Sequence, residues 1–173
     1  MDVSSIKAAI RDVPDFPKPG ILFKDVTPVL GDAKLFRATT DLFAERHAKS
    51  RLDCIAAIEA RGFILGAALA DRLGLGLVPI RKKGKLPYRT VEASYDLEYG
   101  SATLQMHEDA VAKGARVLLI DDLLATGGTA AACVGLIRQL GGVVVEVDFL
   151  VELAFLNGRA KLPDVPVFAP IVF

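Results

Sequence analysis

The spacing of apolar residues predicts two helices in the first 50 residues. Near the N terminus, apolar residues recur at helical spacing behind Ser4 or Ser5 and stop at Pro14: Ile6, Ala9, Ile10 and Val13. They predict a short amphipathic helix. Residues 14–31 are rich in Pro and Gly, which predicts an ordered loop. A second helical pattern follows Asp32, a residue type that caps helices, and predicts a helix to about Ser50.

Beyond residue 50, apolar runs of strand length alternate with helical patterns. The predicted order is a strand at 54–58, a helix at 63–73, strands at 77–80 and 117–120, a helix at 129–140, a strand at 143–151 and a last strand within 167–173. A charged stretch, residues 81–107, interrupts this alternation. Because the strands are apolar on both faces and helices join them, we expect an α/β fold with a central parallel sheet flanked by helices.

Composition narrows the class of protein. The chain has 173 residues, of which 52% are apolar, and this suits a single domain over residues 1–173 with a sizeable core. Its 21 basic and 21 acidic side chains cancel. Since no net positive charge attracts phosphate backbones or anionic lipid, neither a nucleic-acid partner nor a membrane partner is expected.

The cysteines and the N-terminal residues favour a cytoplasmic location. Cys54 and Cys133 stand far apart, with no second Cys or His at metal-ligand spacing, which suits a reducing compartment. The first residues lack the basic start and apolar run of a signal peptide. The longest uncharged run, residues 123–137, is shorter than the roughly 18 residues that a membrane span needs.

The strand predicted at 117–120 ends in candidate chemistry. Ligands of open α/β sheets bind beyond the carboxyl ends of the strands. Asp121 and Asp122 follow this strand, and their carboxylates suit polyol hydroxyls or a hydrated Mg²⁺. A loop of small residues then opens a helix: Ala125, Thr126, Gly127, Gly128 and Thr129. The N–H groups and positive dipole of a helix start can hold a phosphate. A plain strand-to-helix turn is the alternative, but stability alone gives a buried strand no reason to end in two acids.

Two other strand ends carry charged residues. Glu59, Ala60 and Arg61 follow the strand at 54–58, and Arg61 can meet a pyrophosphate or a base, although an Arg–Glu surface pair explains it equally well. Cations cluster after the strand at 77–80: Arg81, Lys82, Lys83 and Lys85. A solvated charged face is an equal alternative for this cluster. The P-loop and the dinucleotide-binding fingerprint do not occur in the sequence.

These segments together resemble a known family. The run VLLIDDLLATGGT at 117–129 closely resembles the phosphoribosyl diphosphate (PRPP) signature of type I phosphoribosyltransferases, in the form of the adenine-specific branch. The resemblance extends to EARGF at 59–63, to the stretch from IRKKGKLP to ASYDLEYG at 80–100, and to FPKPGILFKD at 16–25. It implies that the loop of small residues grips the 5′-phosphate and that Asp121 and Asp122 face the ribose. It also implies that Glu59, Ala60 and Arg61 form a pyrophosphate loop, with Arg81, Lys82 and Lys85 neutralising the diphosphate.

The resemblance further implies two segments that cover the site. Residues 81–107 correspond to a flexible catalytic loop, in which Glu98 is the candidate for proton exchange with the purine and Tyr99 packs near the leaving group. Arg61, Asp121 and Asp122 complete the implied catalytic set. Residues 1–31 correspond to a base-binding hood, where the backbone of Leu22 and Lys24 reads adenine and Phe23 stacks on it.

The implied activity is transfer of the 5-phosphoribosyl group from PRPP to adenine, which gives AMP and diphosphate in purine salvage. The implied partners are adenine, PRPP and a second copy of the chain. The implied cofactor is Mg²⁺, carried by the diphosphate and the ribose and reached by Asp121 and Asp122 through water. A transferase for xanthine, hypoxanthine or uracil and a PRPP-sensing regulator are the alternatives. The regulator lacks support because the chain has neither an added helix-turn-helix domain nor positive net charge.

Overall fold

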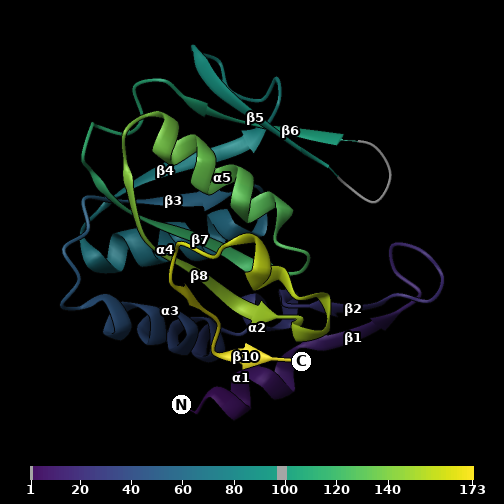
Figure 1. The fold of residues 1–173 in the computed structure, drawn as a ribbon. Helices are drawn as coiled ribbons and strands as arrows, with labels where there is room; N and C mark the ends of the chain where they lie inside the picture. Colours follow the sequence, from purple (N-terminus) through teal and green to yellow (C-terminus); the bar gives the residue numbers. More distant parts are fainter. Residues whose placement is uncertain (1, 97–100) are drawn as a thin grey trace. The chain divides into compact units, whose positions relative to one another are not determined.

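The computed structural model describes residues 2–96 and 101–173. The chain forms two compact units, Met1–His47 and Ala48–Phe173. Figure 1 labels their helices and strands. Within the described ranges, no helix combines the length and the apolar character that a membrane crossing requires.

The first unit contains three helices and a small hairpin among its described residues. In chain order these are α1 (Val3–Ala9), β1 (Arg11–Pro14), β2 (Leu22–Asp25), α2 (Thr27–Gly31) and α3 (Ala33–His47). The two strands pair antiparallel, with Val13 opposite Phe23. The helix predicted after Asp32 is confirmed, because the Asp32 carboxylate accepts the N–H groups of Lys34 at 2.8 Å and Leu35 at 3.0 Å.

Two expectations for this unit are wrong. The first helix is capped by Asp2 rather than by a serine and ends at Ala9, so Val13 lies on β1. Residues 14–31 contain β2 and α2 rather than only a loop. The physical reason is the pairing of β1 with β2, since strand pairing over a long turn leaves no local periodic signal.

The second unit is built on one large sheet. Its elements are β3 (Cys54–Ile58), α4 (Arg61–Leu73), β4 (Gly76–Lys82), β5 (Thr90–Asp96), β6 (Ser101–His107), β7 (Arg116–Leu124), α5 (Gly128–Gln139), β8 (Val143–Glu152), the 3₁₀ turns η1 (Ala154–Leu156) and η2 (Gly158–Lys161), β9 (Val167–Phe168) and β10 (Ile171–Val172). The strand order is β10-β8-β7-β3-β4-β6-β5, and β9 also pairs with β8.

The central strands of this sheet are parallel, which confirms the predicted α/β class. β3 pairs parallel with β4 and β7, and β8 pairs parallel with β7, β9 and β10. The charged stretch 81–107 is largely strand: β5 and β6 form an antiparallel hairpin that extends the sheet beside β4. The single last strand expected within 167–173 is instead two short strands.

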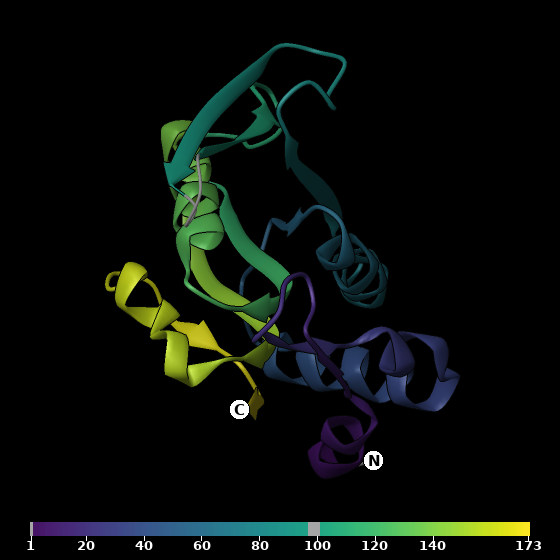
Figure 2. The same cartoon turned by 90° about the vertical axis from the view of Figure 1, so that its right-hand side faces the viewer.

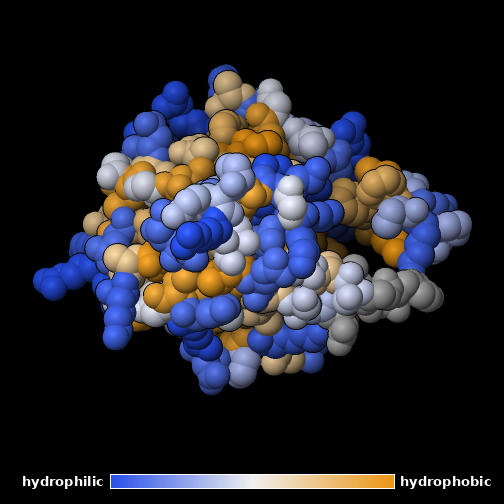
Figure 3. Space-filling model, turned by 90° about the horizontal axis from the view of Figure 1, so that it is seen from above, coloured by the Kyte–Doolittle hydropathy of each residue, from blue (hydrophilic) through white to orange (hydrophobic). Residues whose placement is uncertain are grey.

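Helices cover both faces of the sheet. α4 and α5 lie on opposite faces, and α5 also lies beside β5 (Figures 1 and 2). Residues of β3, β7 and α5 make up much of the buried core, including Ile58, Leu119 and Cys133. On the surface seen from above, apolar residues appear as separate patches between hydrophilic ones (Figure 3).

Close packing of α4 on the sheet depends on Gly66. A Cβ atom at this position would lie 2.6 Å from the Ala57 Cβ and 3.1 Å from the Ile120 Cγ2. Both neighbours are fully buried strand residues that cannot move without disturbing the core.

We therefore expect Gly66→Ala to lower the free energy of unfolding by about 1–3 kcal/mol, because the added methyl overpacks the contact between α4 and the sheet. Urea unfolding measures the change. Gly135→Ala is the matched control: Gly135 is an exposed residue of α5 with no neighbour within 4 Å of the added atom, and alanine there stabilises the helix by about 0.5–1 kcal/mol. Equal effects of the two substitutions would contradict this account of the packing.

Candidate active site

The register of the parallel strands brings two helix starts to one edge of the sheet. Ala57 of β3 lies opposite Ile120 of β7, so the residues that follow them are neighbours. α4 begins at Arg61, three residues after β3 ends, and α5 begins at Gly128, four residues after β7 ends. Parallel strands present their carboxyl ends at the same edge, where ligands of this fold class bind.

Two adjoining cavities lie at this edge. The larger has a volume of about 220 Å³, and the predicted site residues that line it are Glu59, Ala60, Arg61, Lys82, Asp121, Asp122 and Thr129. The smaller has a volume of about 80 Å³ and is lined by the predicted residues Asp121, Ala125, Thr126, Gly127 and Thr129. The structure therefore brings most of the residues predicted in this unit to one place.

The sequence pattern placed Asp121 and Asp122 beyond the end of their strand. In the structure both acids lie inside β7. β7 continues to Leu124, past both carboxylates. The Asp122 side chain is buried and accepts an N–H from Nε of Arg61. The Asp121 carboxylate accepts the backbone N–H of Asp122 at 2.9 Å. Burial, together with the neighbouring charge of Asp122, raises the pKa of Asp121 well above the usual range.

The close approach of α4 to these acids requires Gly62. A Cβ atom on this residue would lie 2.8 Å from Oδ1 of Asp121 and 3.0 Å from the carbonyl oxygen of Ile120. The absence of a side chain at this position therefore lets the first turn of α4, including Arg61, reach the acid pair.

Glu59 binds the end of β4, which contains Arg81 and Lys82 and therefore extends past the strand end predicted at residue 80. Its Oε2 accepts the Nε–H of Arg81 and the backbone N–H of Lys82, each at 3.1 Å. Arg81 also donates from Nη1 to the carbonyl of Lys85 at 3.0 Å. The Arg–Glu pair considered for Arg61 is thus formed by Arg81, while Arg61 pairs with Asp122. Lys82 lines the larger cavity, and Arg81 and Lys85 support the strand end that carries it.

The loop before α5 offers backbone donors to an anion. Gly127 has a left-handed conformation, with φ +80, and is the residue that precedes the helix. Within the described chain, no side chain caps this end of α5. A Cβ on Gly127 would lie 2.2 Å from the carbonyl oxygen of Gly158. The N–H groups of the first turn and the positive end of the dipole are therefore available to a bound anion.

Several lining residues were not predicted. Tyr95, Leu104 and Leu123 line the larger cavity, and Phe149 lines the smaller. Tyr95 and Leu123 lie inside segments that carried the family resemblance, which was the signal that could have found them. Leu104 and Phe149 are buried strand residues with no distinguishing sequence feature.

The residues predicted to bind the base belong to the first unit. Leu22, Phe23 and Lys24 form most of β2. The Nζ of Lys24 lies 2.5 Å from Oδ1 of Asp12, and the Phe23 ring meets the Phe16 ring edge-on at a centroid distance of 5.1 Å. Glu98 and Tyr99 lie outside the described residues.

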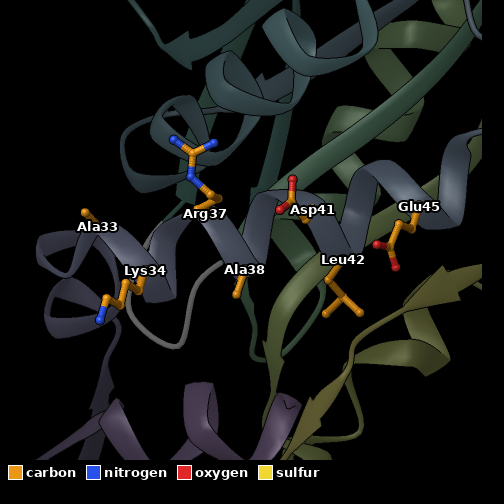
Figure 4. A pocket seen from close by; sticks show the side chains of 7 residues that line it. All are labelled: Ala33, Lys34, Arg37, Ala38, Asp41, Leu42 and Glu45. Atoms are coloured by element: carbon orange, nitrogen blue, oxygen red, sulfur yellow. The ribbon is translucent and has the colours of Figure 1, made fainter. Parts of the chain in front are cut away.

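A hollow of about 530 Å³ runs along α3 in the first unit. Figure 4 shows its lining side chains spaced along this one helix: Ala33, Lys34, Arg37, Ala38, Asp41, Leu42 and Glu45. Two basic residues, Lys34 and Arg37, come before two acidic ones, Asp41 and Glu45, along the helix. The lining includes the start of α3, but there the Asp32 carboxylate already accepts the N–H groups of Lys34 and Leu35. This hollow does not have the chemistry of the carboxyl edge of the sheet.

Comparison with known proteins shows the family to which the whole chain is similar. The family model described as "Phosphoribosyl transferase domain" matches residues 29–163. An adenine phosphoribosyltransferase of Geobacter metallireducens is 54% identical over 171 residues, which cover 99% of this chain and 100% of the relative. The crystal structure of the adenine phosphoribosyltransferase of Thermoanaerobacter pseudethanolicus is similar with a TM-score of 0.97 at 52% identity, over 99% of this chain and 100% of that one. That of the Saccharomyces cerevisiae enzyme, complexed with an imino-altritol bisphosphate and adenine, is similar with a TM-score of 0.93 at 41% identity, over 97% of each chain.

We expect Asp121→Asn to stabilise the protein at neutral pH. Because the folded state raises the pKa of Asp121, the unfolded chain loses this proton at a lower pH than the folded one, so the wild type loses stability as pH rises from the ordinary value of 3.8 through the raised pKa. Asparagine avoids this loss and its side-chain oxygen can still accept the N–H of Asp122. Urea unfolding at pH 5 and pH 8 measures the difference, which grows with pH.

Asp32→Asn is the control of opposite sign. The backbone N–H groups of Leu35 and Lys34 lower the pKa of Asp32, so its charge stabilises the fold above the ordinary pKa and the substitution removes that contribution. A stability difference for Asp121→Asn that stays constant between pH 5 and pH 8, or that shrinks as pH rises, would contradict the expected titration.

Proposed function

Because the chain belongs to the phosphoribosyltransferase family, we propose that it transfers the 5-phosphoribosyl group from PRPP to adenine and forms AMP and diphosphate. The observation that carries this proposal is the junction of an uncapped helix start with two carboxylates in adjoining cavities at one sheet edge. PRPP carries a phosphate next to its ribose, so the phosphate matches the helix start and the ribose hydroxyls match the carboxylates. The similarity to adenine-specific enzymes over nearly the whole chain supports adenine as the base.

The loop before α5 binds the 5′-phosphate in this proposal. Ala125, Thr126, Gly127 and Thr129 line the smaller cavity, where the phosphate accepts backbone N–H groups of this loop and the hydroxyls of Thr126 and Thr129 add donors. Asp121 and Asp122 accept hydrogen bonds from the ribose hydroxyls in the adjoining cavity. Gly127 and Gly128 let the backbone approach the anion closely.

The diphosphate lies toward the basic side of the larger cavity. Arg61 and Lys82 line this cavity with Glu59 and Ala60, and Arg81 and Lys85 add positive charge near the end of β4. Developing negative charge on the departing diphosphate is stabilised by these fixed cations, a contribution that is usually among the largest in catalysis.

The donor set at the acid pair suits Mg²⁺. Magnesium takes oxygen ligands, keeps several of its waters, and commonly reaches proteins through one or two carboxylates and the substrate phosphates. Asp121 and Asp122 offer such carboxylates in the lining of the larger cavity. Asp121 and Asp122 would hold hydrated Mg²⁺, and the ion would neutralise negative charge on the diphosphate of PRPP.

The reaction is a displacement at the anomeric carbon. N9 of adenine forms a bond to C1′ as the C1′–O bond to diphosphate breaks, and the N9 proton leaves the purine. Glu98 is the proposed partner for a purine proton, and Tyr99 packs near the leaving group. Leu22 and Lys24 are two apart on β2 and so direct their backbone groups to the same strand edge, which suits reading the edge of adenine, with Phe23 against its ring.

Two further properties belong to the proposal. Purine salvage in the cytoplasm is consistent with two free cysteines. A homodimer is supported by exposed apolar side chains on adjacent elements, Ile64 on α4 and Leu77 on β4, since exposed apolar patches commonly mark contact surfaces.

The first test is AMP formation from labelled adenine, PRPP and Mg²⁺. We expect product from adenine and none from hypoxanthine, guanine, xanthine or uracil, because a 6-oxo base leaves buried backbone groups unpaired. EDTA should abolish turnover. Turnover with another base would contradict the assignment of Leu22, Phe23 and Lys24 to adenine binding. PRPP binding without any turnover would favour a PRPP-sensing regulator.

The second test concerns the acids. Asp122→Asn should lower kcat/KM roughly 10- to 100-fold, because hydrogen bonds to a charged group are worth about 1.5–3 kcal/mol. Asp109→Asn, an exposed acid after β6, is the matched control and should retain activity. Glu98→Ala should mainly lower kcat. Wild-type kinetics in either site variant would remove that residue from the catalytic set.

The third test is the oligomeric state. Sedimentation at micromolar concentration should give a mass near twice the 18.5 kDa of one chain. Ile64→Asp should shift the protein toward the mass of one chain, whereas Val143→Asp, at an exposed apolar residue of β8, should not. A wild-type mass of one chain would contradict the dimer.

A further inference from the structure

Tyr95 lines the larger cavity but has no role in the transfer reaction described so far. It lies on β5, where it pairs in register with Ala102 of β6. Its ring is partly buried against the hydrophobic core, and it shares the cavity lining with Asp121, Asp122 and Thr129. A tyrosine in this position adds one polar atom, its hydroxyl, to a lining that contains charged side chains and also the apolar Leu104 and Leu123.

That hydroxyl is hydrogen-bonded to the phosphate-binding loop. Oγ1 of Thr129 donates to the hydroxyl oxygen of Tyr95 at 3.1 Å. β5 lies beside α5, so packing between the two elements keeps the ring in place (Figures 1 and 2). The preceding residue, Ser94, points to the other face of the hairpin and exchanges a hydrogen bond of 2.9 Å with Thr103. Of these two neighbouring residues, Tyr95 lines the larger cavity and Ser94 does not.

The direction of the hydrogen bond between Thr129 and Tyr95 changes when a phosphate binds. A hydroxyl has one proton to donate and can accept with its lone pairs. Thr129 cannot donate the same proton to Tyr95 and to a phosphate oxygen, which only accepts. When Thr129 donates to phosphate, Tyr95 can reverse its role and donate its phenolic proton to Oγ1 of Thr129. The contact is then kept, and no donor in it is left unpaired.

We propose that Tyr95 is a positioning residue for PRPP, which acts by holding the Thr129 hydroxyl in place for the 5′-phosphate. This inference rests on the proposed function, since it assigns the 5′-phosphate to the loop before α5. Donation from Tyr95 to Oγ1 polarises the Thr129 hydroxyl and strengthens its bond to the phosphate. The same bond in the free protein keeps the Thr129 side chain in one orientation, so that less conformational freedom is lost on binding.

The role is specific to one substrate. The Tyr95 hydroxyl contacts Thr129 of the loop proposed for the 5′-phosphate, so it should affect PRPP and leave adenine unchanged. A purely structural role of the ring would instead lower stability and affect both substrates. Tyr95→Phe removes the hydroxyl and keeps the ring, which separates the two roles.

The experiment measures the dissociation constant of PRPP with Mg²⁺ by calorimetry and the steady-state constants for both substrates. Tyr95→Phe should raise the Kd and the KM of PRPP about two- to tenfold, the range of one net hydrogen bond. It should leave the KM of adenine, kcat and Tm close to those of the wild type. Thr129→Ser keeps the hydroxyl and should bind PRPP nearly as the wild type does, whereas Thr129→Val should bind it more weakly.

A double variant and a neighbouring control complete the test. In the Thr129→Val background, Tyr95→Phe should have no further effect on PRPP, because the partner of its hydroxyl is already gone. Ser94→Ala, which removes the hydroxyl on the other face of β5, should behave as the wild type. Fully additive effects of the two substitutions, or an unchanged Kd in Tyr95→Phe, would overturn the role of Tyr95 while leaving AMP formation intact. A wild type that does not bind PRPP would overturn the proposed function and this inference together.

Discussion

The parallel pairing of β3 with β7 is the constraint on which the site depends. It aligns Ala57 with Ile120, and the chain that follows each strand turns directly into a helix. Two helix starts and two carboxylates therefore meet at one edge of the sheet without any long connection. Gly62 and Gly66 permit the close packing of α4 that this arrangement needs, because a Cβ at either position would lie under 3 Å from an atom of β7 or β3.

Two arginines of the site are paired with acids before any ligand binds. Arg61 is held by Asp122 and Arg81 by Glu59, all at the same edge of the sheet. The raised pKa of Asp121 shows that this compensation is incomplete: burial and the charge of Asp122 outweigh the favourable effect of Arg61. Such a buried, poorly compensated acid costs stability, and groups of this kind cluster at functional sites.

Much of the fold was predictable from local pattern. The strand at 54–58 and the helix that ends at Leu73 before Gly74 lie where apolar spacing and a left-handed glycine predicted them. The errors occurred where pairing over distance overrides local preference. Val13 belongs to a strand because β2 lies beside it, and the charged stretch after β4 forms a hairpin because its two arms pair with each other and with the edge of the sheet.

The sequence by itself determined the loop that we propose to bind phosphate, since its glycines, threonines and helix start are adjacent in the chain. It also determined which charged residues lie near the carboxyl ends of strands, although not that Asp121 and Asp122 lie inside β7. Only the tertiary structure decided how these groups pair: Arg61 meets Asp122 across 61 positions, Arg81 meets Glu59 across 22, and Thr129 meets Tyr95 across 34. Such partners depend on strand order and register, which arise from the packing of the whole sheet and leave no mark at either residue.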